Sequence, residues 1–159
     1  MSNQNQGLPE FFTKHRCAEF CGQRAQIVVR DKHNKQTYQL ENAGRRTCCL
    51  LRVDGCLLSS GAKCDYLLLA DHRNEAFFIE LKGQDLLKAF AQIDHSISAL
   101  LPHLQGWLLY ARVVLNKVRT PALKSSVEMK LERRLKEINK QNQRAFIVYK
   151  NQLLHERLE

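Results

Sequence analysis

The sequence predicts an α/β fold in which a central mixed β-sheet is flanked by helices. Two apolar runs around a polar turn at residues 65–82 predict a β-hairpin. An amphipathic helix follows to about residue 101, and another apolar strand then spans 107–115. The hairpin strands are apolar on both faces, which is typical of central strands that are covered on two sides.

The expected order of elements is a helix, three strands, a second helix and a fourth strand, with a small hairpin near the N-terminus. Residues 1–9 are expected to form a loose tail, and 10–24 a helix that ends at Gly22. The hairpin comprises strands 26–30 and 36–40 and is either extra to the sheet or lengthens it. The remaining elements are strands 46–58 (interrupted at Asp54-Gly55), 63–70 and 75–82, a helix ended by Pro102, strand 107–115, a helix starting at Thr120-Pro121, and strand 145–149.

Each of the two longer helices has an apolar stripe that is expected to be buried. The stripes are Leu86, Leu87, Phe90, Ile93, Ile97 and Leu100 in the first, and Leu123, Val127, Leu131, Leu135 and Ile138 in the second. A length of 159 residues fits one domain, with a core at 45–115 followed by a basic helix and a final strand at 116–150.

Composition favours a protein of the cytosol. Hydrophobic residues make up 44% of the chain, so a packed core is expected. No run of about 18 apolar residues predicts a membrane span, and the polar first ten residues lack a signal-peptide core. The six cysteines are therefore expected to be free thiols, with a structural zinc or an iron–sulfur cluster as the alternative.

The hairpin at 65–82 brings chemistry-bearing residues together. If it folds about His72 and Arg73, paired positions sum to 145 and Asp65 lies opposite Glu80. Lys82 is two residues further along and shares that face. Two carboxylates attract a hard divalent cation, Mg²⁺ or in its place Mn²⁺, and a lysine beside it can orient water or hold a phosphate. The alternative is a hairpin with a charged tip and an ordinary Glu–Lys pair.

Asp65, the 14-residue spacer, Glu80-Leu81-Lys82 and a following glycine and helix resemble the PD-(D/E)XK nuclease superfamily. The resemblance implies a restriction-endonuclease-like αβββαβ core, with the Asp on the second strand and the Glu-x-Lys on the third. It implies a magnesium-dependent nuclease in repair, recombination or defence, with DNA as the expected substrate, RNA as the second choice, and a homodimer as the expected assembly.

The same resemblance implies roles for particular residues. Asp65, Glu80 and Lys82 would be catalytic, and the Leu81 carbonyl would join the two carboxylates as a metal ligand. Cys64 stands where many members have proline. Additional candidates are Glu10 or Glu19 for an acid on the first helix, Gln84, and Gln92, which with Ser96 half-matches a helix motif of some members. Asp54 is a further candidate ligand from the residues alone, although Asp-Gly is more often a turn.

Net charge is +9 and is unevenly distributed. Residues 41–110 hold 7 basic and 8 acidic residues, whereas residues 111–150 hold 11 basic and 3 acidic ones. This excess favours a nucleic-acid partner over a solvated helix face. The candidate contacts are Lys88, Lys124, Lys130, Arg133 and Arg134. Two other functions stay open: a non-catalytic nucleic-acid-binding module on the same fold, and an interaction or inhibitory subunit for an acidic protein.

Overall fold

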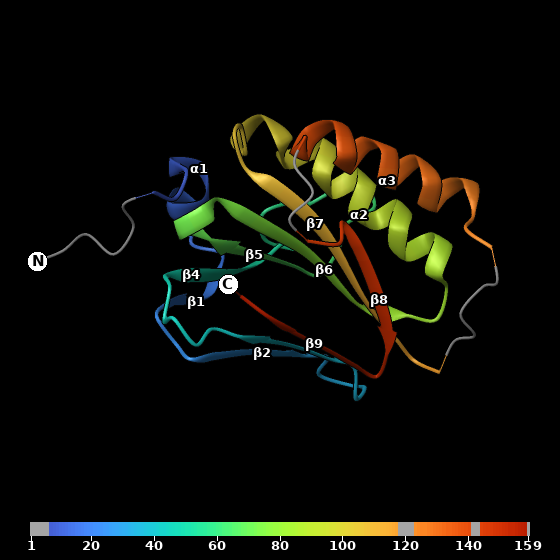
Figure 1. The fold of residues 1–159 in the computed structure, drawn as a ribbon, viewed down its shortest axis with the longest axis horizontal. Coiled ribbons are helices and arrows are strands. Elements are labelled where there is room, and N and C mark those ends of the chain that lie inside the picture. The colour runs from blue at the N-terminus through green and yellow to red at the C-terminus, as the bar shows by residue number, and fades with distance from the viewer. Residues whose placement is uncertain (1–6, 118–122, 141–143, 159) are drawn as a thin grey trace, which may run out of the picture.

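The computed structural model describes residues 7–117, 123–140 and 144–158, except for the side chain of Lys82. A six-stranded mixed sheet lies between a layer of helices and a separate three-stranded sheet (Figure 1). The α/β class with a central mixed sheet is therefore confirmed. Both faces of the central strands are covered, as expected: helices cover one face and the small sheet covers the other.

The large sheet has the strand order β1-β4-β5-β6-β7-β8. The pairs β1–β4, β4–β5 and β5–β6 are antiparallel, whereas the pairs β6–β7 and β7–β8 are parallel. Helix α2 connects β6 to β7, as expected for parallel neighbours. The strands are β1 (Ala18–Gly22), β4 (Cys48–Arg52), β5 (Tyr66–Ala70), β6 (Glu75–Gly83), β7 (Leu108–Leu115) and β8 (Ile147–Asn151).

Two helices pack side by side on one face of this sheet. Asp85 caps α2 (Leu86–Leu100) and Ser125 caps α3 (Ser126–Asn139), each accepting a hydrogen bond from a backbone N–H three residues ahead. Their predicted apolar stripes pack against the core, with Val127 and Ile138 partly buried, except that Leu87 and Leu123 are 48% and 84% exposed. Leu123 precedes the helix, which begins at Ser126, and the predicted start at Thr120-Pro121 lies outside the described residues.

The opposite face is covered by the sheet β2-β3-β9, which consists of β2 (Gln26–Arg30), β3 (Thr37–Glu41) and β9 (Leu153–Arg157). The predicted hairpin is thus confirmed as β2–β3, but it belongs to a second sheet. A buried ion pair ties the two sheets together: Arg112 on β7, 1% exposed, donates to Glu156 on β9 at 2.6 Å. A buried charge is tolerated only where such a partner is present.

The N-terminal region differs from the expectation. Helix α1 covers only Glu10–Lys14, and residues 18–22 form β1 instead of continuing a helix. Leu8, from the expected tail, packs against the helix-side core. The strand expected at 46–58 ends at Arg52, because the backbone turns there and residues 53–58 hydrogen-bond to one another.

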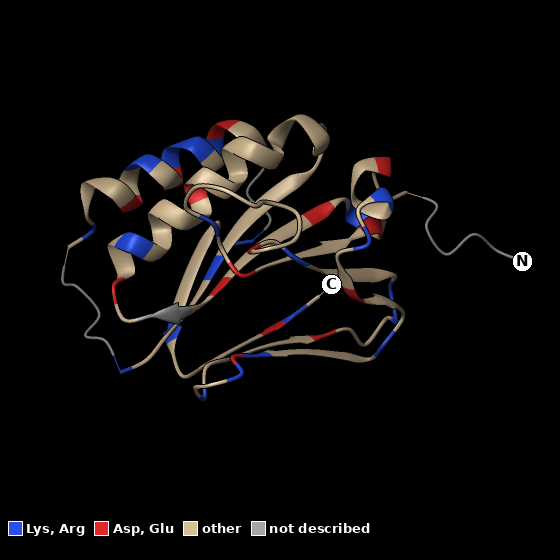
Figure 2. Ribbon diagram, turned by 180° about the vertical axis from the view of Figure 1, so that it is seen from behind, with Lys and Arg blue, Asp and Glu red and all other residues tan. Residues whose placement is uncertain are grey.

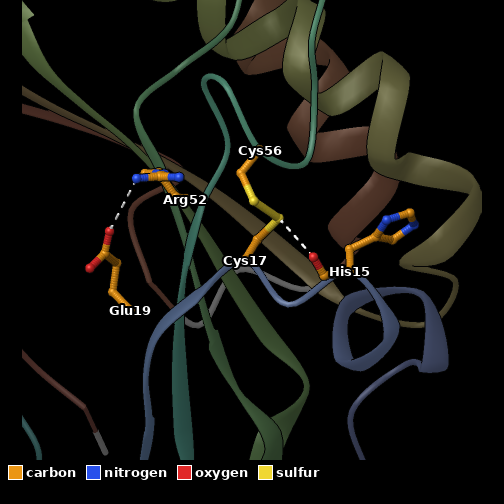
Figure 3. Close-up of a disulfide and its surroundings, with 5 residues drawn as sticks. All are labelled: His15, Cys17, Glu19, Arg52 and Cys56. Carbon is orange, nitrogen blue, oxygen red and sulfur yellow. Dashed lines mark hydrogen bonds and ion pairs between the residues drawn. A yellow bond between two sulfur atoms is a disulfide. The ribbon is translucent and has the colours of Figure 1, made fainter.

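Two disulfides explain the strand at 18–22 and correct the expectation of free thiols. Cys17 is bonded to Cys56, as Figure 3 shows, and Cys21 is bonded to Cys49 on the neighbouring strand β4. Both bonds fasten the first strand and its approach to the large sheet. Only Cys48 and Cys64 stay free, and both are buried. Burial raises the pKa of the Cys48 thiol to about 12, so this thiol is unreactive at neutral pH.

The remaining short elements are the 3₁₀ turns Asp71–Arg73 and Leu101–His103. The first closes the β5–β6 hairpin, with Asn74 in the left-handed conformation that asparagine tolerates (φ 52°). No helix of the described chain is long and apolar enough to cross a membrane.

Candidate nuclease-like site

The β5–β6 hairpin has the predicted register. Tyr66 pairs with Ile79 and Ala70 with Glu75, so each pair sums to 145. Asp65 immediately precedes β5, and its backbone N–H donates to the Ile79 carbonyl at 3.1 Å. Its carboxylate accepts a hydrogen bond from the Leu81 N–H at 2.9 Å. The Asp65 side chain is therefore held against the Glu80-Leu81-Lys82 segment.

Strand β6 carries an irregularity at this segment. Glu80 pairs with Val113 of β7, but Gly83 pairs with Leu115, so β6 has one more residue than β7 between these pairs. Such bulges bend a strand and redirect the side chains next to them, and they are frequent beside active sites. This bulge falls on Leu81-Lys82. The backbone of Lys82 is part of β6, while the prediction for its side chain lies outside the described residues.

Alternation along the strands places Asp65 and Glu80 on the helix-facing side. Leu67, two residues after Asp65, belongs to the core beneath α2 and α3, as does Phe78, two residues before Glu80. The Leu81 side chain lies in the core on the opposite face. Glu80 is buried, with 2% exposed, and Asp65 is partly buried.

The free thiol of Cys64 lies close to both carboxylates. Burial raises the pKa of this thiol far above its usual range; the Ser96 hydroxyl lowers it, and the charges of Glu80 and Asp65 raise it further. Cys64 is therefore a neutral thiol beside the acids, at the position that proline takes in many members of the superfamily.

Two polar residues of α2 support the segment that leads into Asp65. The Gln92 amide donates to the Lys63 carbonyl at 3.2 Å, and the Cys64 N–H donates to the Ser96 hydroxyl at 2.9 Å. Gln92 and Ser96 form the half-matching helix motif noted in the sequence. In the structure they hold the backbone of residues 63–64, which makes them positioning groups for Asp65.

Three other acids were candidates for the site: Asp54, Glu19 and Glu10. Asp54 is exposed and forms an ion pair with Lys63 at 3.4 Å, and it lines the same surface hollow as Asp65. Glu19 lies on β1, 4.0 Å from Arg52, on the side of the molecule shown in Figure 3. Its expected position on a first helix is wrong, because residue 19 is in a strand. Glu10 begins the short helix α1.

Some of the cations predicted to contact nucleic acid form ion pairs within the fold, and the others are exposed. Arg134 donates to the Asp94 carboxylate at 2.7 Å and to the Ser98 hydroxyl at 2.8 Å, which ties α3 to α2. Lys124 pairs with Glu132 at 2.8 Å. The exposed candidates are Lys88, Lys130 and Arg133, and Gln84 is also exposed.

Tertiary contacts therefore offset part of the basic excess at 111–150. Arg112 and Arg144 are paired with Glu156 and Glu75, which lie outside that segment of the sequence. Figure 2 shows that the remaining blue segments of α3 lie along the outer layer of helices.

The donor set suits a hard cation. Two carboxylates and a backbone carbonyl are oxygen ligands of the kind that Mg²⁺ takes while it keeps several waters. Within the described residues, no three His, Cys, Asp or Glu side chains gather as a metal-binding group. Asp65, Glu80 and the Leu81 carbonyl are thus sufficient only for an ion that stays largely hydrated.

The structure adds residues that the sequence did not predict. A hollow beside Asp65 is also lined by Arg30, Asp31, Lys32 and His33, from the end of β2 and the loop after it. The charged run in that loop was the available signal, but nothing in the sequence placed the loop against the β5–β6 hairpin.

The chain matches no protein-family model, no curated protein and no solved structure in the comparisons made with it. The resemblance to the PD-(D/E)XK superfamily accordingly depends on the motif residues and on their place in the sheet.

Proposed function

We propose that this protein is a metal-dependent nuclease that hydrolyses phosphodiester bonds, with DNA as the preferred polymer and RNA as the second choice. The observation that carries the proposal is the hairpin register, which sets Asp65 beside the Glu80-Leu81-Lys82 segment. The order of β4, β5, β6, α2 and β7 supports it, because the Asp then precedes the second strand and the Glu-x-Lys lies on the third.

Each motif residue has a distinct role in this proposal. Asp65, Glu80 and the Leu81 carbonyl hold the metal ion. Bound there, the ion would lower the pKa of a water ligand and stabilise negative charge on the phosphoryl oxygens. Lys82 orients the attacking water and stabilises the pentacovalent phosphate. Gln84 and Lys88, at the start of α2, contact neighbouring phosphates.

A second candidate function is a non-catalytic nucleic-acid-binding module on the same fold. The small number of acidic ligands among the described residues favours it, because two carboxylates alone bind a divalent cation weakly. An interaction or inhibitory subunit is the third candidate. These functions would keep the fold without requiring hydrolysis.

Cleavage assays separate the candidates. We expect the wild type to cut plasmid or labelled DNA with Mg²⁺ or Mn²⁺ and to be inactive in chelator. Lys82→Ala and Glu80→Gln should each reduce single-turnover cleavage by roughly 10²-fold or more, as for loss of a transition-state contact. Lys14→Ala, on the exposed end of α1, is the matched control and should cut normally. Cleavage that survives chelation would exclude the metal mechanism, and no cleavage with any substrate would favour the binding module.

The proposal also includes a biological process, an assembly and a cellular location. Repair, recombination or defence against foreign DNA suits such an enzyme, and a homodimer is the expected assembly. A cytosolic location conflicts with persistent disulfides, which are rare in reducing compartments. Counting free thiols in protein taken directly from cells under alkylating conditions would decide this point: two free thiols indicate an oxidising compartment and six a reducing one.

A further inference from the structure

A surface hollow adjoins the candidate site between the loop after β2 and the segment around Asp65. It encloses about 170 Å³, and its walls come from two directions. One wall is the end of β2 and the following loop; the other is formed by the ends of β4 and β5 and the motif segment of β6. Its lining residues are Arg30, Asp31, Lys32, His33, Arg52, Asp54, Asp65, Tyr66 and Leu81. Asp65 and Leu81 therefore border both the hollow and the proposed metal site.

The loop side of the hollow carries cations that can receive an anion. Arg30 and Lys32 are exposed, and neither forms an ion pair with any residue that the structure describes. Arg52, on the opposite wall, is half-exposed, and its one ion pair within the described residues is the 4.0 Å contact with Glu19. By contrast, Lys124 and Arg134, on or near α3, are already paired within the fold. The hollow thus offers more available positive charge near Asp65 than the sequence-predicted basic helix does.

Asp31 gives a second, independent indication of a ligand. One of its carboxylate oxygens accepts the His33 backbone N–H at 3.0 Å, which fixes the turn that presents Lys32. The other oxygen, Oδ2, is buried and has no hydrogen-bond partner in the described chain, and the residue as a whole is 9% exposed. A buried acceptor without a donor costs about 1–3 kcal/mol or more when it is charged, so a ligand that brings an N–H or O–H group would relieve it.

We propose that this hollow binds a nucleotide unit of the substrate strand next to the scissile phosphate. Arg30 and Lys32 contact the phosphate, and Asp31 accepts a hydrogen bond from an N–H or O–H group of the same nucleotide. A nucleotide carries both groups at once. This inference rests on the proposed nuclease function for its substrate, and it assigns strand binding to the β2–β3 loop instead of α3.

Binding measured in chelator tests the inference separately from chemistry. The probe is a fluorescein-labelled single-stranded 12-mer, followed by anisotropy over a salt series. Arg30→Gln/Lys32→Gln is compared with Lys130→Gln/Arg133→Gln, which removes one Arg and one Lys from the exposed surface of α3. The two variants have the same net charge, so a difference between them reports location. Urea denaturation checks that both are folded.

We expect the loop variant to bind at least about tenfold more weakly and to lose about 0.7 units of log–log salt slope, since Arg30 and Lys32 contact one phosphate and each neutralised single-strand phosphate contributes about 0.7. The α3 variant should bind much as the wild type does. Equal losses in the two variants, or a greater loss in the α3 variant, would overturn the assignment to the loop.

Asp31→Asn tests the acceptor role. Asparagine keeps an oxygen for the His33 N–H but replaces the second acceptor with a donor, and it removes one negative charge. If Asp31 only repels the polyanion, this variant binds more tightly; if Asp31 accepts from the nucleotide, it binds more weakly. Weaker binding supports the proposal, and equal or tighter binding overturns the role of Asp31.

The two hypotheses can fail independently. Weaker binding by the loop variant without metal-dependent cleavage by the wild type would reject the nuclease function and retain the hollow as a nucleotide-binding site. Metal-dependent cleavage by the wild type, with unchanged binding by the loop variant, would retain the nuclease and reject the hollow.

Discussion

Removing the Cys17–Cys56 disulfide should destabilise the protein by less than its loop length suggests. The bond closes a loop of 39 residues, for which loop-closure entropy predicts about 4 kcal/mol. The Cys21–Cys49 bond lies inside that loop and shortens it. With the Cys21–Cys49 bond in place, the Cys17–Cys56 bond closes a loop that consists of four residues from Cys17 to Cys21 and seven from Cys49 to Cys56. A loop of about 11 residues contributes about 3 kcal/mol, and both bonds together about 6 kcal/mol.

The measurement is urea denaturation of the wild type and of Cys17→Ser/Cys56→Ser, each with and without reductant. We expect the variant to lose about 3 kcal/mol in oxidising buffer and the reduced wild type about 6 kcal/mol. A loss of 6 kcal/mol approaches the whole stability of a small domain, ~5–15 kcal/mol, so the reduced protein should be only marginally folded. Thiol titration in denaturant is the control, and it should find two free thiols in the oxidised wild type. Six would show that the bonds do not form, and two with no loss in the variant would refute the loop-closure reasoning.

Three further predictions concern charged groups away from the site, and urea denaturation measures each. Arg134→Gln should lower the free energy of unfolding by about 1 kcal/mol, because the Arg134 guanidinium bridges α3 to α2. The control Arg133→Gln, at an exposed residue, should change the free energy of unfolding by less than about 0.5 kcal/mol. Equal effects of the two substitutions would contradict the bridging role. Glu156→Gln should cost about 3 kcal/mol, since it leaves Arg112 buried beside a neutral group. Burial raises the pKa of the Glu128 carboxyl, so the folded state binds the carboxyl proton more tightly than the unfolded state does. Above the folded pKa the carboxylate is charged and therefore weakens the fold. Glu128→Gln should therefore stabilise the protein at pH 7, with the gain disappearing as the pH falls below about 4.3; a gain that persists at pH 3 would contradict this origin.

The hairpin could be predicted from sequence because its determinants are local. A short polar turn and continuous apolar strands leave few registers, and residues 71–74 close it in the expected place. The same reasoning located α2, whose apolar spacing and Asp85 cap lie close together in the chain. The position of Asp65 against the Glu80-Leu81 segment could be predicted for the same reason, because it follows from a register that a few neighbouring residues determine.

The N-terminal region could not be predicted because distant contacts decide it. Apolar spacing at 10–24 suits a helix, yet Cys21 is bonded to β4 and residues 18–22 pair with that strand along their length. Strand β9 was missed for a related reason. Its five residues are mostly exposed, and it is held by parallel pairing with β3 and by the ion pair between Glu156 and Arg112.

If the hollow binds the substrate strand as proposed, charge distribution in the sequence is a poor guide to the binding surface for a physical reason. A basic segment attracts a polyanion only through cations that the fold leaves available, and buried or paired cations contribute little. Arg112, Arg134 and Arg144 count toward the basic excess but serve internal contacts. Arg30 and Lys32 lie outside the basic segment 111–150, yet they remain exposed and line the same hollow as Asp65.

Burial also determines the direction from which a substrate can reach the candidate site. Glu80 is 2% exposed, so a phosphate cannot approach it through the helical layer that covers it. Asp65 is the more accessible of the two acids, and the surface onto which it opens is the hollow beside the β2–β3 loop. Helix α2 packs on β6 and α3 packs on β7, so a strand bound along α3 would lie farther from that opening than one bound along α2. The cations of α3 are then placed to attract a polyanion over a distance and to speed its encounter. Under the proposed nuclease function, contact with the phosphate next to the reacting one is left to groups that line the hollow.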